Sequence, residues 1–344
     1  MIQSSYYNFD FNQKSSNKFE IFQDELKILQ TDIVDLNQVK FKNESIKYEV
    51  SCENIKKFKN YVAILPIKDD IKLLKYTIEK IKKFDVLYHM DFIIVDDRPQ
   101  NKVIKDFVLH NNLTYVSINN EKGFNFSMLN NIAALLAKNN GAKNIILWNS
   151  DLWPDNDKTI PRLIEKFENN NASVAGTKLL YPNTDIIIDG KDFFDLSNIE
   201  THFPDKVKSF YNSVQYGGSN FIFNNQLNSY VPTHSHRFKQ KDNIFVNTDK
   251  IELFITGAFQ IIKLQDFIDV GGLNPSLSKN FQDVEFCFKL LDKDKKILYF
   301  GHDIHLVHAE SVTLTKNNKY DIQMTSDTIL FSKLCGKNYL KIIS

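Results

Sequence analysis

The part of the sequence that decides the fold begins with YVAILPIKDD at residues 61–70 and ends with NIILWNSD at residues 144–151. It contains four short apolar runs, at residues 61–67, 92–95, 113–118 and 144–148. Such runs, bounded by proline, glycine or charged residues, are typical of buried strands. The segments between these runs have apolar residues at helical spacing. Strands that alternate with helices predict right-handed βαβ units, and therefore an α/β fold with a mostly parallel central sheet flanked by helices.

Acidic side chains follow two of these predicted strands. Asp96 and Asp97 end the second run, and Asp151 comes shortly after the fourth. In open α/β sheets, ligands bind beyond the carboxyl ends of the strands. Carboxylates at that edge suit hydrogen bonds to a ribose or a base, or binding of a hard cation such as Mg²⁺ or Mn²⁺.

Composition excludes several classes of protein. The 344 residues carry 43 basic and 42 acidic side chains, a net charge of +1, which argues against a nucleic-acid-binding protein. That length corresponds to one large domain or two small ones. No apolar run approaches the length of a transmembrane helix, and the N-terminus lacks the apolar core of a signal peptide. The three cysteines lie far apart in the sequence, so we expect a reduced, cytoplasmic protein.

The regions on either side of this stretch are less regular. In residues 1–58 the pattern allows a helix around Phe19–Leu29 and one or two short strands near Val39–Val50, and it indicates no chemistry. A helix near Ile160–Asn169 and a strand at Ser173–Leu180 are predicted next. Residues 181–250 look like a long loop, which in a compact enzyme is usually a binding loop or lid.

Regular structure is predicted again toward the C-terminus. Regular secondary structure is expected at Ile251–Ile262, and an amphipathic helix with Asp283 at its start is expected at Phe281–Leu291. Strands are expected near Lys296–Phe300 and Ile304–His308, and a final helix at Asp321–Leu334.

Several motifs in this order resemble a known family. They are ILPIKDD at 64–70, IIVDD at 93–97, GFNFSMLNNIAALL at 123–136, ILWNSD at 146–151, GGLNPSLSKNFQDVEFCFKL at 271–290 and IHLVHAES at 304–311. Together they resemble the family 2 glycosyltransferases, the large inverting group on the GT-A fold. LLYPNTDIIIDG at 179–190 and TGAF at 256–259 are similar to a rhamnosyltransferase-like bacterial subgroup.

The resemblance spans about 61–335 and implies a division of the chain. Residues 59–344 would form the GT-A domain, with a nucleotide-binding half at 59–151 and an acceptor-side half at 152–344. Residues 1–58 would be an N-terminal extension whose role stays open.

The resemblance also implies roles for individual residues. A divalent cation, Mg²⁺ or Mn²⁺, would be held by Asp151 and His308. The general base would be Asp283. The nucleotide would be bound by residues from four of the motifs: Pro66, Asp69, Asp96, Asp97, Asn131, Asn149 and Ser150.

Three positions depart from the family pattern. The D-x-D position reads Asn149-Ser150-Asp151, so only its last carboxylate remains. The Glu-Asp pair reads Gln282-Asp283, and Lys68-Asp69 stands where an aromatic residue and Asn are common. Each proposed site residue also has a structural alternative: Asp151 as a helix cap, Asp96 and Asp97 as turn residues, and His308 as a structural histidine.

The general-base assignment rests on the chemistry of inversion. One carboxylate must take the proton from the acceptor hydroxyl as it attacks the anomeric carbon. A position in the first turn of a helix favours the ionised form of Asp283 through the helix dipole. Glu285, two residues on, should point about 200° away and so cannot share this role. Trp153, close to Asp151, is a candidate for stacking on a sugar.

The sequence thus predicts an inverting, metal-dependent glycosyltransferase. The donor would be a UDP- or dTDP-linked sugar, and the acceptor a hydroxyl of a glycan, lipid-linked saccharide or surface polysaccharide. A cytoplasmic location at the inner face of a membrane, with peripheral association, would suit such acceptors. Two alternatives stay open: a nucleotidyltransferase that makes a nucleotide-sugar, for which the first strand lacks a glycine-rich basic loop, and a degenerate, non-catalytic binding module.

Overall fold

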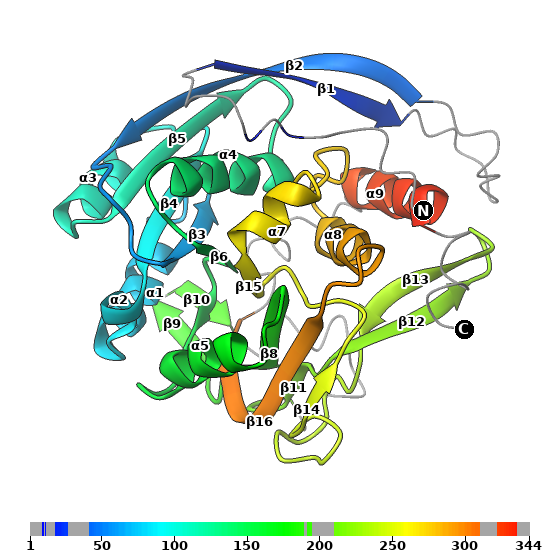
Figure 1. Cartoon of the computed structure of the whole chain (residues 1–344). Coiled ribbons are helices and arrows are strands. Elements are labelled where there is room, and N and C mark those ends of the chain that lie inside the picture. The colour runs from blue at the N-terminus through cyan, green and yellow to red at the C-terminus, as the bar shows by residue number, and fades with distance from the viewer. Residues whose placement is uncertain are drawn as a thin grey trace.

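The structure is a computed structural model that describes Phe9, Phe11 and residues 18–26, 41–188, 191–194, 210–309 and 322–335. The last two residues of each of the motifs 179–190 and 304–311 lie outside the described residues, as does the expected helix start at Asp321. The main element is a twelve-stranded sheet whose principal strand order is β1-β2-β5-β4-β3-β6-β15-β8-β16-β14 (Figure 1).

The centre of the sheet is parallel, as the apolar runs predict. Its four strands occur in the order β5 (Thr114–Asn120), β4 (Asp91–Asp97), β3 (Tyr61–Ile67) and β6 (Asn144–Trp148). Their side chains are almost all buried, because helices cover both faces of the sheet.

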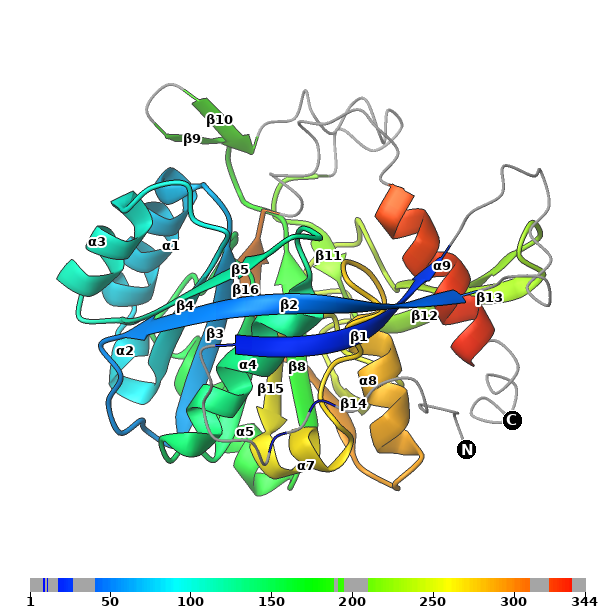
Figure 2. The same ribbon diagram turned by 90° about the horizontal axis from the view of Figure 1, so that it is seen from above.

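The order of these strands creates a topological switch point. The chain moves outward from β3 to β4 and β5, and then returns to β6 on the other side of β3. Right-handed crossovers therefore put α4 (Phe126–Asn139) on the opposite face from α1 (Ile71–Lys83) and α3 (Val103–His110), as Figure 2 shows. The short helix α2 (Val86–His89) leads into β4. Ligands bind at such switch points, beyond the carboxyl ends of β3 and β6.

The second half of the sheet begins with an antiparallel strand. β15 (Phe259–Lys263) runs antiparallel to β6 and to β8 (Val174–Leu180). Beyond it, β16 (Ile297–His308) is parallel to β8, with an irregularity between Phe300 and His305 where two separate strands were predicted. Shorter strands join this part of the sheet: β7 (Leu152–Trp153), β11 (Val214–Tyr216) and β14 (Asp249–Ile251).

The N-terminal segment belongs to the sheet. The predicted helix around Phe19–Leu29 is wrong, because β1 (Lys18–Leu26) is an extended strand that pairs with β2 (Phe41–Glu53). β2 in turn pairs antiparallel with β5. The side chains of residues 46–50 in β2 alternate between the core and solvent, and pairing with this strand overrides the local helical preference of β1.

Residues 181–250 contain more regular structure than the sequence predicts. Besides β11 and β14 they include two hairpins, β9 (Ile186–Ile188) with β10 (Lys191–Phe194) and β12 (Ser219–Asn224) with β13 (Ser229–His234). Their strands are three to six residues long, too short for a clear alternating pattern. The remaining helices are α5 (Thr159–Asn169), α7 (Leu264–Asp269), α8 (Gln282–Leu291) and α9 (Ile322–Cys335).

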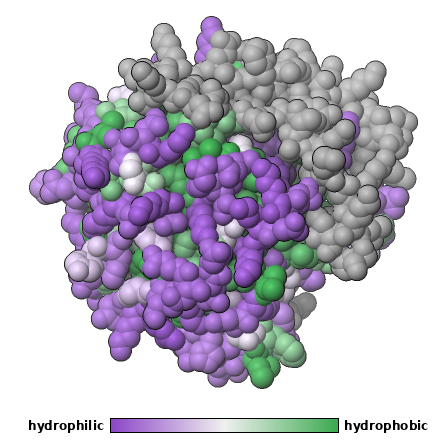
Figure 3. Space-filling view, in the orientation of Figure 1, coloured by the Kyte–Doolittle hydropathy of each residue, from purple (hydrophilic) through white to green (hydrophobic). Residues whose placement is uncertain are grey.

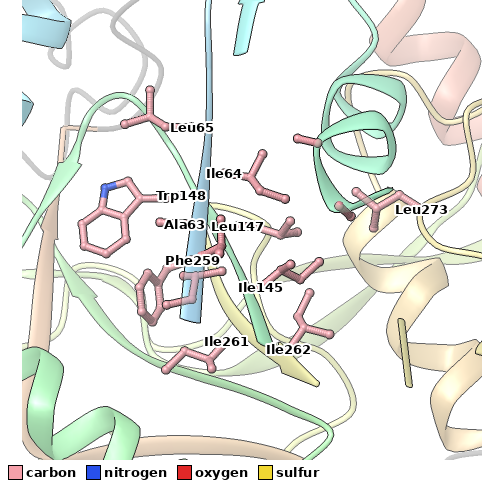
Figure 4. Close-up of a cluster of buried hydrophobic side chains, with 14 of the residues drawn as sticks. Ala63, Ile64, Leu65, Ile145, Leu147, Trp148, Phe259, Ile261, Ile262 and Leu273 are labelled. Atoms are coloured by element: carbon pink, nitrogen blue, oxygen red, sulfur yellow. The ribbon is translucent and has the colours of Figure 1, made fainter. Parts of the chain in front are cut away.

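The core is centred on the junction of β6 and β15. Trp148 of β6 is fully buried, and its ring makes edge contacts with Phe92 at 5.3 Å and Phe259 at 5.4 Å between centroids. Figure 4 shows Trp148 and Phe259 next to each other in a cluster of aliphatic side chains from β3, β6 and β15. This packing fixes the ends of β6 and β15 relative to each other.

Among the described residues, no helix combines the length and the apolar character that crossing a bilayer requires. On the face shown in Figure 3, hydrophilic side chains predominate, and the hydrophobic ones form small separate patches.

A pair of isoleucines tests whether the N-terminal segment is part of the cooperative fold. Ile46 of β2 is buried in the core, whereas Ile55, just after β2, is 45% exposed. We expect Ile46→Ala to lower the free energy of unfolding by about 2–5 kcal/mol, because it leaves a cavity. Ile55→Ala should change it by less than about 0.5 kcal/mol. Urea denaturation of both variants measures this, and equal effects would contradict the assignment of β2 to the core.

Candidate active site

A cavity of about 660 Å³ lies at the switch point of the sheet. Two of its walls are the carboxyl ends of β3 and β6, and a third is the segment before β15 together with the first turn of α8. Side chains of β11 and β13, namely Gln215, Pro232, Thr233 and His234, and the end of β16 complete it. Seven of the ten predicted site residues line this cavity: Pro66, Asp69, Asn149, Ser150, Asp151, Asp283 and His308.

Asp151 and His308 meet at the cavity wall. The register of β7 with β16 places His308 opposite Leu152, and the backbone N–H of Ala309 donates to the carbonyl of Asp151 at 3.0 Å. His308 Nε2 then lies 3.2 Å from Asp151 Oδ1. Both residues are less than a tenth exposed. Two residues more than 150 positions apart in the sequence thus form one carboxylate–imidazole pair.

Two side chains close to this pair in the sequence, His305 and Trp153, point elsewhere. His305 points away from this pair and contacts Asp155 at 2.6 Å, as the alternation along a strand predicts. Trp153 does not line the cavity: it is buried, with its ring edge-on to Tyr76 at 5.0 Å. The prediction that Trp153 stacks on a sugar is therefore wrong, because β7 directs this side chain into a small core cluster instead.

Asp283 lies in the first turn of α8 with its carboxylate held by two backbone donors. Gly257 N–H donates to Oδ2 at 2.5 Å, and Val284 N–H donates to Oδ1 at 2.9 Å. Gly257 allows this close approach, since a Cβ at this position would lie only 3.2 Å from the carboxylate and would press on the Asp283 side chain. The predicted stabilisation of the ionised form by the helix end is outweighed: burial raises the pKa of Asp283, and the two backbone N–H groups only partly oppose it.

Glu285 faces the core, away from Asp283. It is buried and forms an ion pair with Lys289, with 3.1 Å between Oε2 and Nζ. Lys289 also donates to the carbonyl of Gly272 at 2.7 Å. The two acidic side chains of α8 thus point in different directions, as the helical spacing predicts.

Asp96 and Asp97 are fully buried and do not line the cavity. The hydroxyl of Tyr115 donates to Asp96 at 2.8 Å, and Arg98 is paired with Asp97 at 2.6 Å. Burial raises the pKa of Asp96 to about 6, against the lowering effect of the Tyr115 hydrogen bond. The structure thus does not place these carboxylates where the predicted direct contact with a base or ribose would occur. The reason is local: each is already engaged by a neighbouring side chain.

Asn131 is a structural residue. It is completely buried in α4, where its side chain donates to the carbonyl of Leu273 and accepts from the N–H of the same residue, at 2.8 and 2.9 Å. The predicted nucleotide contact is therefore corrected: the amide of Asn131 binds the turn that follows Gly271 and Gly272 to α4. Both glycines have positive φ, at 77° and 70°, so this turn depends on them.

Sequence reasoning missed the role of α9. Asp327 on this helix is buried, and its Oδ2 accepts from the backbone N–H groups of Lys279 and Asn280, at 2.7 and 2.9 Å. These residues line the cavity and lead into Phe281, which has a left-handed φ of 63° before α8 begins. Asp327 thus fixes the loop that carries Asp283. Nothing in the sequence around Asp327 indicates this long-range contact.

The described part of the chain holds no cluster of three or more His, Cys, Asp or Glu side chains placed to bind a metal ion. The Asp151–His308 pair therefore offers two protein ligands at most. One carboxylate oxygen and one imidazole nitrogen form a mixed set that suits Mn²⁺ better than Mg²⁺, which prefers oxygen.

No family model and no curated protein sequence matches the chain. Among solved structures it is similar to a crystal structure of GalNAc-T7 with UDP, GalNAc and Mn²⁺, at a TM-score of 0.50 and 12% identity. That match covers 73% of this chain and 44% of the other, so this chain spans less than half the length of the GalNAc-T7 structure.

Two further structures match with lower TM-scores. One is the mannosyltransferase PcManGT from Pyrobaculum calidifontis in complex with GDP-Man and Mn²⁺, with a TM-score of 0.44, 9% identity, and 83% and 72% of the two chains covered. The other is S. aureus TarS 1-349, with a TM-score of 0.46, 12% identity, and 80% and 71% covered. The fold of this protein is the GT-A fold.

The raised pKa of Asp96 predicts a pH dependence of stability. Because the shift runs from 3.8 to about 6, the folded state binds more protons than the unfolded state within that window, and the free energy of unfolding falls as the pH rises through it. Asp96→Asn removes this dependence. Relative to wild type, the variant should gain up to about 3 kcal/mol between about pH 4 and pH 7.

Urea denaturation at the two pH values measures this gain. Asp157→Asn, on an exposed loop, is the control and should show no such gain. A difference between Asp96→Asn and wild type that does not change with pH would contradict the assigned environment of Asp96.

Proposed function

We propose that this protein is an inverting glycosyltransferase that moves a sugar from a nucleotide-sugar to a hydroxyl of a glycan acceptor. The observation that carries the proposal is the cavity at the switch point of a GT-A fold, lined by both the Asp151–His308 pair and Asp283. Such a cavity combines a place for a charged leaving group with a carboxylate that can take a proton. Fold alone would not support an activity, but these side chains in one cavity do.

The residues of the cavity fit a divalent cation. Asp151 and His308 would hold it through Oδ1 and Nε2, which lie 3.2 Å apart, and the diphosphate and water would supply the other ligands. When bound, the ion neutralises the negative charge that grows on the departing diphosphate. The similar GalNAc-T7 structure contains UDP and Mn²⁺. We therefore favour Mn²⁺ or Mg²⁺ as the cofactor, with Mn²⁺ preferred for the imidazole ligand.

Asp283 is the proposed general base. Its two hydrogen bonds, from Gly257 and Val284, hold the carboxylate in a fixed orientation at the cavity wall. Burial raises its pKa, which makes the carboxylate a stronger base while it is ionised. The proton of the acceptor hydroxyl would pass to Asp283 as that oxygen attacks the anomeric carbon from the face opposite the diphosphate.

The nucleotide would lie between the ends of β3 and β6. Pro66 and Asp69 from one strand end, and Asn149 and Ser150 from the other, are the proposed contacts. A UDP- or dTDP-linked sugar is the proposed donor. The proposed acceptor is a glycan or lipid-linked saccharide for a surface polysaccharide, and a cytoplasmic location with peripheral membrane association would suit it.

Loss of Asp151 tests the cation site. We expect Asp151→Ala to abolish the Mn²⁺-dependent part of UDP binding, because His308 alone is a poor site for a hard cation. Titration calorimetry with and without Mn²⁺ measures it, and circular dichroism checks the fold. Asp157→Ala, at an exposed position nearby, is the matched control and should bind as wild type does. Unchanged Mn²⁺-dependent binding in Asp151→Ala, or full transfer in EDTA, would rule the assignment out.

Replacement of Asp283 tests the base. Asp283→Asn keeps the shape of the side chain but cannot accept the proton. We expect donor binding to stay near wild type while transfer falls at least about 100-fold, since a general base acts in the chemical step. Steady-state transfer and donor calorimetry are the measurements.

Two variants serve as comparisons for the base. Asp294→Asn, at an exposed position after α8, should transfer sugar at the wild-type rate. Glu285→Gln should lower the free energy of unfolding, because it leaves Lys289 buried without its ion-pair partner. Its turnover per folded molecule should change less. An active Asp283→Asn together with an inactive, folded Glu285→Gln would show that the base was assigned to the wrong residue.

A further inference from the structure

A chain of polar side chains continues behind the Asp151–His308 pair. Gln215 of β11 is 1% exposed, and its amide lies between two imidazoles. Its Oε1 is 3.4 Å from Nδ1 of His308, and its Nε2 is 3.2 Å from Nδ1 of His234 on β13. All four residues, Asp151, His308, Gln215 and His234, line the same cavity. These hydrogen-bonded side chains therefore connect the proposed cation site to the segment at residues 210–234.

The orientation of the Gln215 amide decides which tautomers of His308 and His234 fit these hydrogen bonds. In the structure its oxygen faces Nδ1 of His308, and because an amide oxygen can only accept a hydrogen bond, this arrangement requires a proton on that Nδ1. The lone pair of His308 Nε2 is then available on the side where Asp151 lies. At the other end, the amide NH₂ of Gln215 donates to Nδ1 of His234, which leaves the proton of that ring on Nε2.

The opposite orientation of the amide would have a different consequence. Its NH₂ group would then face Nδ1 of His308, and the ring proton would move to Nε2. An Nε2–H group donates to Asp151 and cannot bind a metal ion. Because the two imidazoles present Nδ1 to the two ends of one amide, the tautomer of His234 and the tautomer of His308 are linked through Gln215.

We propose that Gln215 is a positioning residue that holds His308 as a metal ligand, and that His234 orients the Gln215 amide. This inference rests on the proposed function, since it concerns the ligand set of the cation site. Metal-bound histidines usually donate their second ring N–H to an oxygen, which fixes the ring and raises its basicity. Gln215 provides such an oxygen from an element outside the motifs that the sequence shares with glycosyltransferases.

The packing around the chain keeps its members in place. β11 and β16 both pair with β8, at Leu179 and Leu180, and this common neighbour sets the position of Gln215 relative to His308. The ring of His234 stands edge-on to Tyr216 at 5.0 Å, and Tyr216 is fully buried with its hydroxyl donating to the carbonyl of Phe254 at 2.8 Å. The segment at residues 210–234 is thereby coupled to the cation site through side chains of defined orientation.

Three variants separate a positioning role from a merely structural one. Gln215→Met has a similar volume and cannot accept the hydrogen bond. Gln215→Glu can accept it, so it should rescue the His308 end of the chain. Gln226→Met, at an exposed position in the turn between β12 and β13, is the matched control for the Gln-to-Met change.

The first measurement needs no metal. In nuclear magnetic resonance spectra of the metal-free, ¹⁵N-labelled protein, assigned with a His308→Asn variant, we expect an exchange-protected Hδ1 signal from His308. It should persist in Gln215→Glu and Gln226→Met and disappear in Gln215→Met. A wild-type His308 ring that carries its proton on Nε2 alone would overturn the proposal, and so would a protected Hδ1 in Gln215→Met.

The second measurement uses Mn²⁺ together with UDP. Electron paramagnetic resonance of free Mn²⁺ should give an affinity about 10–100-fold weaker for Gln215→Met than for wild type. Gln215→Glu and Gln226→Met should stay close to wild type. An unchanged affinity in a folded Gln215→Met would also overturn the proposal.

The two measurements distinguish the inference from the proposed function. If the wild type shows the protected Hδ1 signal but binds no Mn²⁺ with UDP, the hydrogen bond stands, and the cation part of the proposed function fails. The claim that Gln215 serves a metal ligand would be overturned with it. If Mn²⁺ binds and depends on Asp151 but not on Gln215, only the inference fails.

Discussion

The antiparallel pairing of β6 with β15 is the interaction on which the rest of the site depends. It sets Trp148 opposite Phe259, and the N–H of Asn149 donates to the carbonyl of Ala258 at 3.0 Å. The end of one strand therefore lies beside the beginning of the other. Asp151 follows β6 directly, while Gly257, which precedes β15, binds the carboxylate of Asp283. Without this pairing the two proposed chemical groups would belong to separate parts of the molecule.

Each buried acidic side chain at this edge of the sheet has a specific partner. Arg98 pairs with Asp97, Tyr115 donates to Asp96, and two backbone N–H groups bind Asp283. Such partners are necessary, because a buried carboxylate without them would be protonated or would destabilise the fold. Of these groups, only Asp283 lines the cavity. Asp283 and Asp151 are thus the two carboxylates proposed to act in the site, whereas Asp96 and Asp97 do not reach the cavity.

The sequence predicted the central strands and the ends that line the cavity, because buried parallel strands leave a strong local pattern. β6 is found at Asn144–Trp148, the same residues as its apolar run. The partners of Asp96 and Asp97 were not predicted: Tyr115 reaches Asp96 from the neighbouring strand β5, and Arg98, the residue after Asp97, folds back onto it. Asn131 was likewise assigned to the ligand, although its partner, Leu273, lies 142 positions away.

Segments whose structure depends on distant pairing were the least predictable. A helix was predicted at β1 because the strand depends on pairing with β2, a separate segment further along the sequence, and the strands of the hairpins within residues 181–250 are too short to show a period. Gln215 and Asp327 belong to the same class. Each acts on the site through a contact with a residue that is more than 45 positions away, and neither stands in a recognisable motif.

The identity of the small product tests the central claim most directly. A panel of UDP-, dTDP- and GDP-linked sugars would be incubated with the wild-type protein and Mn²⁺, and the nucleotide products separated by ion-exchange chromatography. Transfer or slow hydrolysis by a glycosyltransferase releases a nucleoside diphosphate, and we expect this product from at least one donor, with Asp283→Asn releasing far less. In a parallel incubation with nucleoside triphosphates and sugar phosphates, their consumption with release of pyrophosphate would instead show a nucleotidyltransferase and contradict the account. So would a protein that binds these donors but leaves every one of them intact.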